Sequence, residues 1–287
     1  MTAIDLNTLG VVGGGTMGAG IAQVAVQSGA AVVLVEQTDD RARTARSRID
    51  AALAKLAGRG KITETARAEA MDRLTVTTAY ADLAGADVVV EAVFEELGAK
   101  LEVARAVAAI VGPDTLFASN TSSISMDRIA DGFPRPELVV GIHFFNPVPV
   151  LPLVEVVAGE RTSAETVERA TALATRLGKT PILVKDRPGF VVNRLLIPMI
   201  NEAALLAGEG VATYEDVDTA MRLGASHPLG PLALGDLIGL DVCLAIMRTL
   251  AADLDAVRFA PAPLLQRLVA EGKLGRKTGG GFFAYDK

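Results

Sequence analysis

The sequence predicts an α/β fold in which a doubly wound sheet is followed by an all-helical C-terminal domain. Three observations predict this fold. Short valine-rich runs alternate with longer amphipathic segments in the first part of the 287-residue chain. A glycine-rich motif directly follows the first of these runs, and the apolar pattern becomes purely helical after about residue 187. We therefore expect one domain over residues 1–186 and a second over residues 187–287.

Seven apolar runs are expected to form the strands of the first domain. Several of them contain three or four consecutive apolar residues, which indicates strands buried on both faces, as in a parallel sheet. The expected strands are 8–14, 30–36, 73–78, 87–93, 115–120, 137–144 and 180–186. The helical patterns between them are 16–28, 40–57, 63–71, 97–111 and 163–177. Strand and helix in alternation predict a doubly wound α/β sheet.

The second domain is expected to consist of helices. Segments such as "NRLLIPMINEAALLAGEG" and "LALGDLIGLDVCLAIMRTLAADL" have a helical period and are separated by glycine or proline. Only a short strand near the end of the chain is expected there. The linker between the domains is expected at "KDRPGF" (185–190), because Pro188 and Gly189 break regular structure.

Composition and charge argue against several classes of protein. No apolar run reaches about 18 residues without a charge or a breaker, so we expect no membrane span. The start, "MTAIDLNTLGVVGGG", has no basic region and no cleavage pattern, so we expect no signal peptide. A net charge of -6 without a basic block argues against nucleic acid. The lone cysteine, Cys243, fits a buried thiol in the reducing cytoplasm, and no Cys/His cluster predicts a metal.

The glycine-rich motif "GVVGGGTMGAGIA" (10–22) has the G-x-G-x-x-G spacing of a dinucleotide site in a Rossmann-type domain. It follows an expected strand and opens an expected helix, and an acidic residue ends the next strand, 18 positions after the third glycine. Such a turn brings backbone amides and the positive helix end to a pyrophosphate. The alternatives are a generic glycine turn and a solvated acid at the strand end. The expected cofactor-binding residues here are Gly13, Gly15, Thr16, Met17, Gly18 and Glu36.

A second polar stretch, "FASNTSSIS" (117–125), lies at the carboxyl end of another expected strand. In an open α/β sheet, ligands bind at this edge. Ser119 and Asn120 line the edge by adjacency. Thr121 or Ser122 could equally be the N-cap of the following helix, because both residue types are common caps.

One of the two histidines of the chain, His143, ends the apolar run "LVVGIHF" at the same edge of the sheet. Twelve residues later, "LPLVEVV" places Glu155 inside an apolar run, where a carboxylate is costly unless it is paired. A carboxylate–imidazole pair is the usual composition of a general base. The alternatives are a core histidine bonded to backbone and an edge strand with Glu155 facing water.

Together these motifs resemble the 3-hydroxyacyl-CoA dehydrogenases of the short, stand-alone type, over nearly the whole chain. The segments that carry the resemblance include "GGGTMGAGIA", "VVEAVFEE", "FASNTSS", "GIHFFNPVPVLPLVEVV", "DRPGFVVNRLL" and "GRKTGGGFFAY". The resemblance implies reversible, NAD-dependent oxidation of an L-3-hydroxyacyl-CoA, such as 3-hydroxybutyryl-CoA, to a 3-oxoacyl-CoA. It also implies a homodimer formed through the helical domain, and a substrate cleft between the sheet edge and that domain.

The resemblance also implies roles for individual residues. The catalytic histidine falls on His143 and its orienting glutamate on Glu155. The substrate-contacting serine and asparagine fall on Ser122 and Asn193. The nicotinamide-side glutamate and lysine fall on Glu95 and Lys100, and Asn120 is added to the cofactor side because it lies on the same edge. The second histidine, His227, is interpreted as structural.

One departure concerns the helical arm that holds the CoA phosphates in this family. Its serine position falls on Ala52, and the basic residues available are Lys55, Arg59 and Lys61. Two other functions remain open. A dehydrogenase of a sugar acid or small hydroxy acid would have no use for these basic residues. A non-enzymatic NAD-binding or structural relative, as related lens crystallins exemplify, would have no reason to keep the proposed catalytic set.

Overall fold

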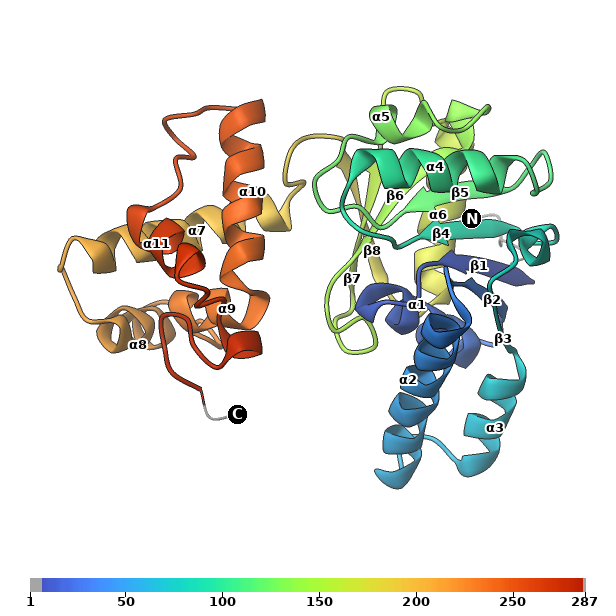
Figure 1. Ribbon diagram of the computed structural model, residues 1–287, viewed down its shortest axis with the longest axis horizontal. Coiled ribbons are helices and arrows are strands. Elements are labelled where there is room, and N and C mark those ends of the chain that lie inside the picture. Colours follow the sequence, from blue (N-terminus) through green and yellow to red (C-terminus); the bar gives the residue numbers. More distant parts are fainter. Residues whose placement is uncertain (1–6, 286–287) are drawn as a thin grey trace. The chain divides into compact units, whose positions relative to one another are not determined.

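The chain divides into two compact units, Met1–Arg187 and Pro188–Lys287. The structure is a computed structural model that describes residues 7–285. The first residues, on which the expectation of no signal peptide partly rests, lie outside this range. Figure 1 shows the helices and strands of both units, and each unit has its own hydrophobic core.

The first unit is built on an eight-stranded sheet with the order β3-β2-β1-β4-β5-β6-β7-β8. All neighbouring strands are parallel except β6 and β7. The strands are β1 (Thr8–Val12), β2 (Ala31–Val35), β3 (Leu74–Thr77), β4 (Val88–Glu91), β5 (Leu116–Ser119), β6 (Val139–Phe144), β7 (Leu153–Ala158) and β8 (Thr180–Lys185). The predicted doubly wound α/β fold is thereby confirmed.

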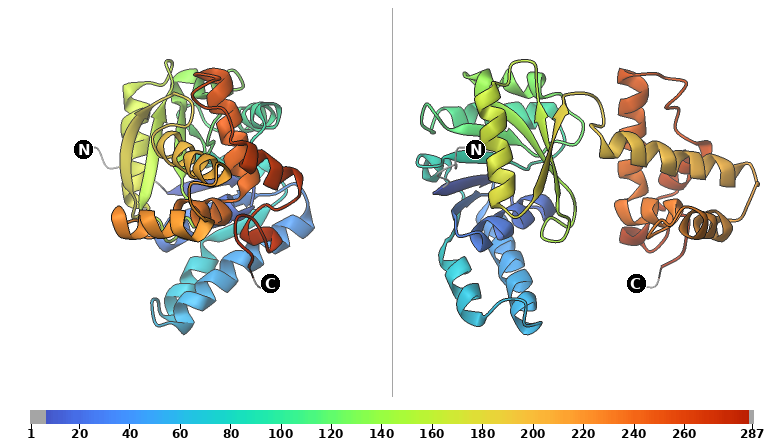
Figure 2. Two further views of the ribbon diagram at one scale, coloured as in Figure 1. Left: turned by 90° about the vertical axis from the view of Figure 1, so that its left-hand side faces the viewer. Right: turned by 180° about the vertical axis from the view of Figure 1, so that it is seen from behind.

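Helices cover both faces of this sheet. Figures 1 and 2 show α4 and α5 on one face and α1 and α6 on the other, which explains why the central strands read as continuous apolar runs. The helices are α1 (Thr16–Gln27), α2 (Asp39–Gly58), α3 (Glu64–Asp72), α4 (Leu97–Ala108), α5 (Met126–Ala130) and α6 (Ala164–Arg176). Short 3-10 turns lie at η1 (Tyr80–Leu83) and η2 (Pro136–Leu138).

Strand β7 was not among the strands expected from the sequence, because Glu155 interrupts its apolar pattern. The hypothesis that this stretch is an edge strand with Glu155 facing water is wrong. β7 lies between β6 and β8, and Glu155 is completely buried. Because β7 runs antiparallel to β6, Glu155 lies directly opposite His143 in the register of the two strands.

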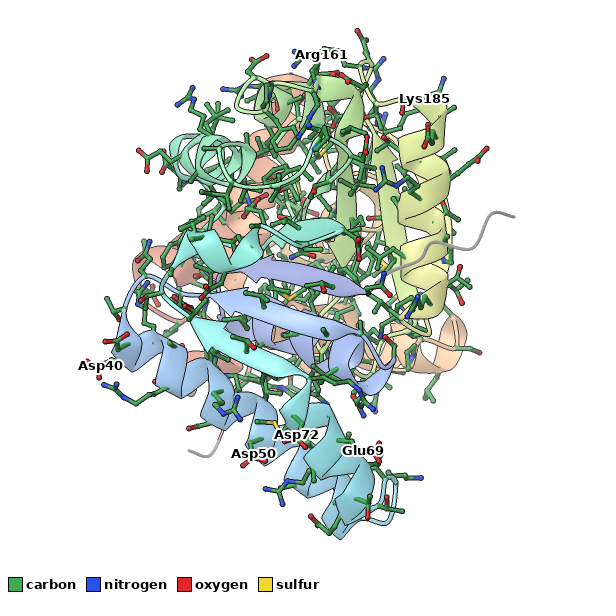
Figure 3. All side chains as sticks on the ribbon, turned by 90° about the vertical axis from the view of Figure 1, so that its right-hand side faces the viewer. Asp40, Asp50, Glu69, Asp72, Arg161 and Lys185 are labelled. Carbon is green, nitrogen blue, oxygen red and sulfur yellow. The ribbon has the colours of Figure 1, made fainter. Side chains whose placement is uncertain are left out.

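Helices α2 and α3 form a hairpin that projects beyond the sheet. Thr38 and Thr63 cap their first turns by accepting hydrogen bonds from Arg41 N and Ala66 N. An ion pair of 2.7 Å between Asp50 and Arg67 links the two helices. Figure 3 labels four acidic residues of this hairpin: Asp40, Asp50, Glu69 and Asp72.

The second unit is helical, as predicted. Its helices are α7 (Val192–Gly208), α8 (Tyr214–Gly224), α9 (Pro231–Ile238), α10 (Leu240–Asp253) and α11 (Pro263–Ala270), followed by a 3-10 turn η3 (Arg276–Thr278). Where a short strand was expected near the end, the structure has isolated bridges at Gly275–Gly280 and Gly280–Ala284. Cys243 is buried in α10, and this burial raises the pKa of its thiol to about 12. Within residues 7–285, no helix is both long and apolar enough to cross a membrane.

Candidate active site

The glycine turn between β1 and α1 has the geometry that a close backbone approach requires. Gly13 has a φ of 96°, and a Cβ there would lie 2.8 Å from the Ala92 carbonyl oxygen. A Cβ on Gly18 would lie 1.8 Å from the Gly13 carbonyl oxygen, so only glycine allows α1 to pack this closely. A Cβ on Gly15, in contrast, would meet no atom within 4 Å, which leaves open space above the start of α1.

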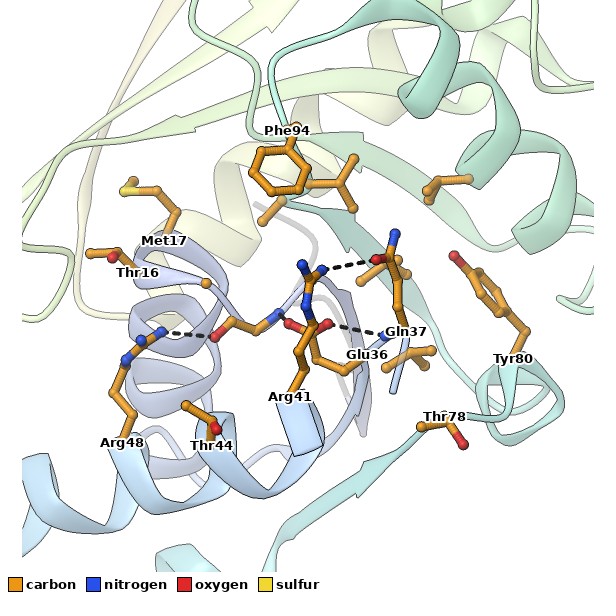
Figure 4. A pocket seen from close by; sticks show the side chains of 18 residues that line it. Thr16, Met17, Glu36, Gln37, Arg41, Thr44, Arg48, Thr78, Tyr80 and Phe94 are labelled. Carbon is orange, nitrogen blue, oxygen red and sulfur yellow. Dashed lines mark hydrogen bonds between the residues drawn. The ribbon is translucent and has the colours of Figure 1, made fainter. Parts of the chain in front are cut away.

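A cavity of about 590 Å³ lies over this turn (Figure 4). Its volume is within the range of small-molecule and cofactor sites. Thr16, Met17 and Glu36 line it, as does Phe94. α1 has no acidic residue in its first turn, and within the described chain no side chain caps its amides. The positive end of α1 therefore faces the cavity and suits a phosphate.

Glu36 has a fixed place at the end of β2. Its Oε1 accepts a hydrogen bond of 2.7 Å from Gly14 N, and its Oε2 accepts one of 3.0 Å from Gln37 N. Figure 4 shows the carboxylate between the glycine turn and Gln37, within the cavity lining. A carboxylate held at this position can accept hydrogen bonds from ribose hydroxyls.

Arg41, Arg48 and Tyr80 also line the cavity, and of these Arg48 and Tyr80 were not singled out from the sequence. Arg48 donates to Gly14 O at 3.1 Å, and Arg41 donates to the Gln37 side chain at 2.8 Å. The two arginines are seven residues apart on α2 and thus share a helix face, a signal that could have found Arg48. Burial raises the pKa of Tyr80, and so do the charges of Glu91 and Glu36.

His143 and Glu155 are in direct contact. His143 Nδ1 lies 2.7 Å from Glu155 Oε2, and both side chains are buried. The antiparallel pairing of β6 with β7 is the cause, because cross-strand neighbours on one face of a sheet meet directly. The Phe145 ring packs against the imidazole with 4.6 Å between the ring centroids.

Glu95 holds the turn that contains Ser122. Its Oε1 accepts hydrogen bonds from Ser122 N at 2.7 Å, Ser123 N at 2.9 Å and Thr121 Oγ1 at 2.7 Å. Burial raises the pKa of Glu95, but the Lys100 charge and the hydrogen bonds from Thr121 and Ser122 outweigh it, so the pKa lies below its ordinary value. The N-cap of α5 is Ser125, so the hypothesis that Thr121 or Ser122 caps this helix is wrong.

The residue that holds Lys100 is Glu91, which was also not singled out from the sequence. Lys100 Nζ lies 2.9 and 3.0 Å from the two carboxylate oxygens of Glu91 and 3.2 Å from Glu95 Oε2. A lone acid inside the apolar run "VVVEAV" was the available signal. Asn120, on the same edge, accepts a 2.9 Å hydrogen bond from Phe144 N, directly after His143.

The other predicted residues lie elsewhere. Asn193 is the second residue of α7 and belongs to the second unit. Lys55, Arg59 and Lys61 are exposed at the end of α2 and just after it, and none of them lines the cavity. His227 follows α8, outside the described site. Among the residues that the structure describes, no group of three or more His, Cys, Asp or Glu could hold a metal ion.

Both units match domains of one protein family. Residues 8–187 match the 3-hydroxyacyl-CoA dehydrogenase NAD binding domain. Residues 189–285 match the 3-hydroxyacyl-CoA dehydrogenase C-terminal domain. The chain belongs to the 3-hydroxyacyl-CoA dehydrogenase family. The resemblance found in the sequence is confirmed, and the cavity over the glycine turn lies in the NAD-binding domain of this family.

Individual family members are similar over almost the full length of the chain. The 3-hydroxybutyryl-CoA dehydrogenase of Clostridioides difficile is 44% identical over 279 residues, which are 97% of this chain and 99% of that protein. The human mitochondrial hydroxyacyl-coenzyme A dehydrogenase is 44% identical over 283 residues, which are 96% of this chain and 90% of that protein. The crystal structure of (S)-3-hydroxybutyryl-CoA dehydrogenase PaaH1 from Ralstonia eutropha has a TM-score of 0.96 and 45% identity, covering 99% of this chain and 100% of that one.

Proposed function

We propose that this chain catalyses the reversible, NAD-dependent oxidation of a short-chain L-3-hydroxyacyl-CoA, such as 3-hydroxybutyryl-CoA, to the 3-oxoacyl-CoA. The buried His143–Glu155 contact of 2.7 Å carries the proposal, because it supplies a general base at the edge of an NAD-binding sheet. The similarity to 3-hydroxybutyryl-CoA dehydrogenases supports the substrate class. An assay that follows NADH formation at about 340 nm with 3-hydroxybutyryl-CoA tests it directly.

The mechanism follows from what each side chain can donate or accept. The nicotinamide of bound NAD supplies the hydride acceptor for C3 of the substrate. With Glu155 ionised, its carboxylate accepts a hydrogen bond from Nδ1–H of His143, and this tautomer leaves Nε2 free to take the substrate hydroxyl proton. Glu155 then stabilises the imidazolium that forms. In the reverse direction His143 returns the proton to the 3-oxo oxygen.

The substrate oxygens require donors that hold them in place during transfer. We assign this role to Ser122 and Asn193, on the residue-by-residue resemblance to the family. Glu95 accepts a hydrogen bond from the backbone amide of Ser122 and so fixes the position from which the Ser122 side chain extends. Glu95, Lys100 and Asn120 form the nicotinamide side of the site in this proposal. Positioning of the reacting groups is a large part of such catalysis.

The CoA phosphates are assigned to the basic residues at the end of α2. Lys55, Arg59 and Lys61 are all exposed there, and the family serine is replaced by Ala52. Three cations within about two helical turns can hold a phosphate without that hydroxyl.

We expect CoA thioesters to react, and the free acid and the short N-acetylcysteamine thioester to be poor substrates. Contacts to the remote phosphates contribute to positioning at C3, so truncation is expected to lower kcat as well as kcat/KM. Steady-state kinetics on 3-hydroxybutyrate, its N-acetylcysteamine ester and its CoA ester measure this. Equal rates on the acid and the CoA ester would instead support the small hydroxy acid dehydrogenase.

We propose that the second unit forms a homodimer. Several large apolar side chains of this unit are exposed in the single chain, among them Leu195 (71%), Leu223 (80%) and Leu237 (55%). Exposed apolar surface of this kind is typical of protein interfaces. Light scattering at micromolar concentration is expected to give twice the chain mass of 29.8 kDa, and a monomer mass would contradict the proposal.

We place the protein in the cytoplasm, because its one cysteine is an unpaired, buried thiol.

A further inference from the structure

Glu91 is a buried carboxylate at the carboxyl end of a central strand, and the reaction described above gives it no role. It is the last residue of β4 and has no exposed surface. Its oxygens accept from Val93 N at 2.7 Å, Ser119 Oγ at 2.6 Å and Lys100 Nζ at 2.9 and 3.0 Å. Ser119 is its register partner on β5. A carboxylate this deep in a sheet is destabilising unless it is paired and bonded, as it is here.

Lys100 links Glu91 to a second carboxylate. Its ammonium is also buried, with a side chain that is 1% exposed, and lies 3.2 Å from Glu95 Oε2. Two carboxylates therefore share one cation below the surface of the site. If the Glu91 charge is lost, Lys100 has only the half-exposed Glu95 as a charged partner among these contacts, and its position must change.

Glu95 connects this ion pair to the predicted substrate serine. Its Oε1 is bonded to the backbone amides of Ser122 and Ser123 and to the Ser122 hydroxyl, the last at 3.2 Å. A continuous series of contacts thus runs from Glu91 through Lys100 and Glu95 to Ser122. Each contact is charge-assisted, the stronger class of hydrogen bond.

We propose that Glu91 is a positioning residue that acts through Lys100 and Glu95 to fix the Thr121–Ser123 turn and thereby place the Ser122 hydroxyl for the reaction. The inference rests on the proposed function, in which Ser122 contacts the substrate oxygen. A purely structural ion pair between β4 and α4 would affect stability alone. The positioning role requires that Glu91 and Ser122 be energetically coupled.

The first test compares Glu91→Gln with a matched control, Asp87→Asn. Asp87 directly precedes the same strand, and its carboxylate also accepts backbone amides, at 2.7 and 2.9 Å, but at the opposite end of β4. We expect Glu91→Gln to lower kcat on 3-hydroxybutyryl-CoA by about 10- to 100-fold, the range for a displaced reacting group, and Asp87→Asn to change kcat less than about twofold. Equal losses in both variants would overturn the proposal.

A double-mutant cycle separates positioning from stability. Ser122→Ala is expected to lower kcat in the wild-type background and to have a much smaller effect in the Glu91→Gln background, because the serine is already misplaced there. If the two losses multiply, Glu91 does not act through Ser122 and the proposal is wrong.

Hydrogen exchange of the 119–126 segment gives a readout that does not depend on turnover. The amides of Ser122 and Ser123 are bonded to Glu95, so their exchange is expected to accelerate in Glu91→Gln and not in Asp87→Asn. Unchanged exchange in Glu91→Gln would overturn the inference even in an active enzyme. If the wild type instead lacks activity on acyl-CoA while exchange accelerates, the proposed function fails and the contact series stands.

Should Glu91→Gln fail to fold, the double variant Glu91→Gln/Lys100→Met removes both buried charges together. Replacing a buried ion pair by neutral groups of similar volume is commonly tolerated, so this variant is expected to fold. It is still expected to show fast exchange in the 119–126 segment, because Glu95 has lost Lys100. Slow exchange and full kcat in the double variant would contradict the proposal.

Discussion

Replacing His143 by Gln is expected to lower turnover by roughly two to four orders of magnitude, the range for loss of a positioned general base. Gln is close in size to the imidazole and can still donate to Glu155, so the packing between β6 and β7 is largely kept. It cannot take the substrate proton. His143 contacts Glu155 and does not line the cavity over the glycine turn. The affinity for NAD is therefore expected to change little.

Pre-steady-state kinetics of NADH formation, with a separate titration of NAD binding, measure the two parts of this prediction. His227→Gln is the matched control, since it replaces the only other histidine of the chain by the same residue, and wild-type turnover is expected for it. If His143→Gln kept more than about a tenth of wild-type turnover with chemistry rate-limiting, the assignment of the base would be wrong.

Glu155→Gln is expected to lower turnover too, because it removes the charge that supports the imidazolium.

The strands and helices of the first unit follow closely from local apolar patterns, because strands buried on both faces need continuous apolar runs. Strand β7 shows where this reasoning fails. Glu155 interrupts its pattern, and its tertiary contact with His143 helps to make a buried carboxylate tolerable there. Glu155 thus makes β7 difficult to predict from the sequence, and the proposed catalytic pair requires the same residue. Such conflicts between local pattern and fold are common at functional sites.

The parts of the site also differ in how far the sequence predicts them. The glycine turn and Glu36 lie in one βαβ unit with fixed spacing, so their arrangement could be predicted before the structure. The contacts of Glu91 with Lys100 and Ser119 join residues 9 and 28 positions apart, at helical and strand positions that no local pattern relates. The contact with Lys100 depends on the packing of α4 against β4, and the contact with Ser119 depends on the parallel pairing of β4 with β5. The roles of Ser122, Asn193 and the basic arm remain predictions from resemblance.

The enzyme is expected to prefer NAD over NADP by about a hundredfold or more in kcat/KM. Glu36 is the cause. Both of its oxygens are oriented by backbone amides, Gly14 N at 2.7 Å and Gln37 N at 3.0 Å, so the carboxylate cannot easily turn away from the ribose position. The 2'-phosphate of NADP would bring negative charge against it and displace the hydroxyl that it binds. A hundredfold preference corresponds to about 2.7 kcal/mol, which one close like-charge contact with a lost hydrogen bond can supply.

Nearby cations are the feature that could oppose this preference. Arg41 and Arg48 both line the cavity, but Arg41 donates to the Gln37 side chain at 2.8 Å and Arg48 donates to Gly14 O at 3.1 Å. Arg43 is bonded to Asp40 at the exposed start of α2. To bind one of these arginines, a 2'-phosphate would have to break the arginine's present hydrogen bond or ion pair. Glu36 would still repel the phosphate.

Glu36→Ala is expected to erode the preference mainly by weakening NAD, because the lost hydrogen bonds affect NAD while the lost charge relieves NADP. Asp39→Ala is the matched control: it removes a nearby carboxylate at the exposed start of α2 that lies outside the cavity lining, so the ratio should stay near the wild-type value. The ratio of kcat/KM for the two cofactors is the measurement in all three proteins. Comparable efficiency with NAD and NADP in the wild type would show that Glu36 does not determine which ribose the cavity accepts.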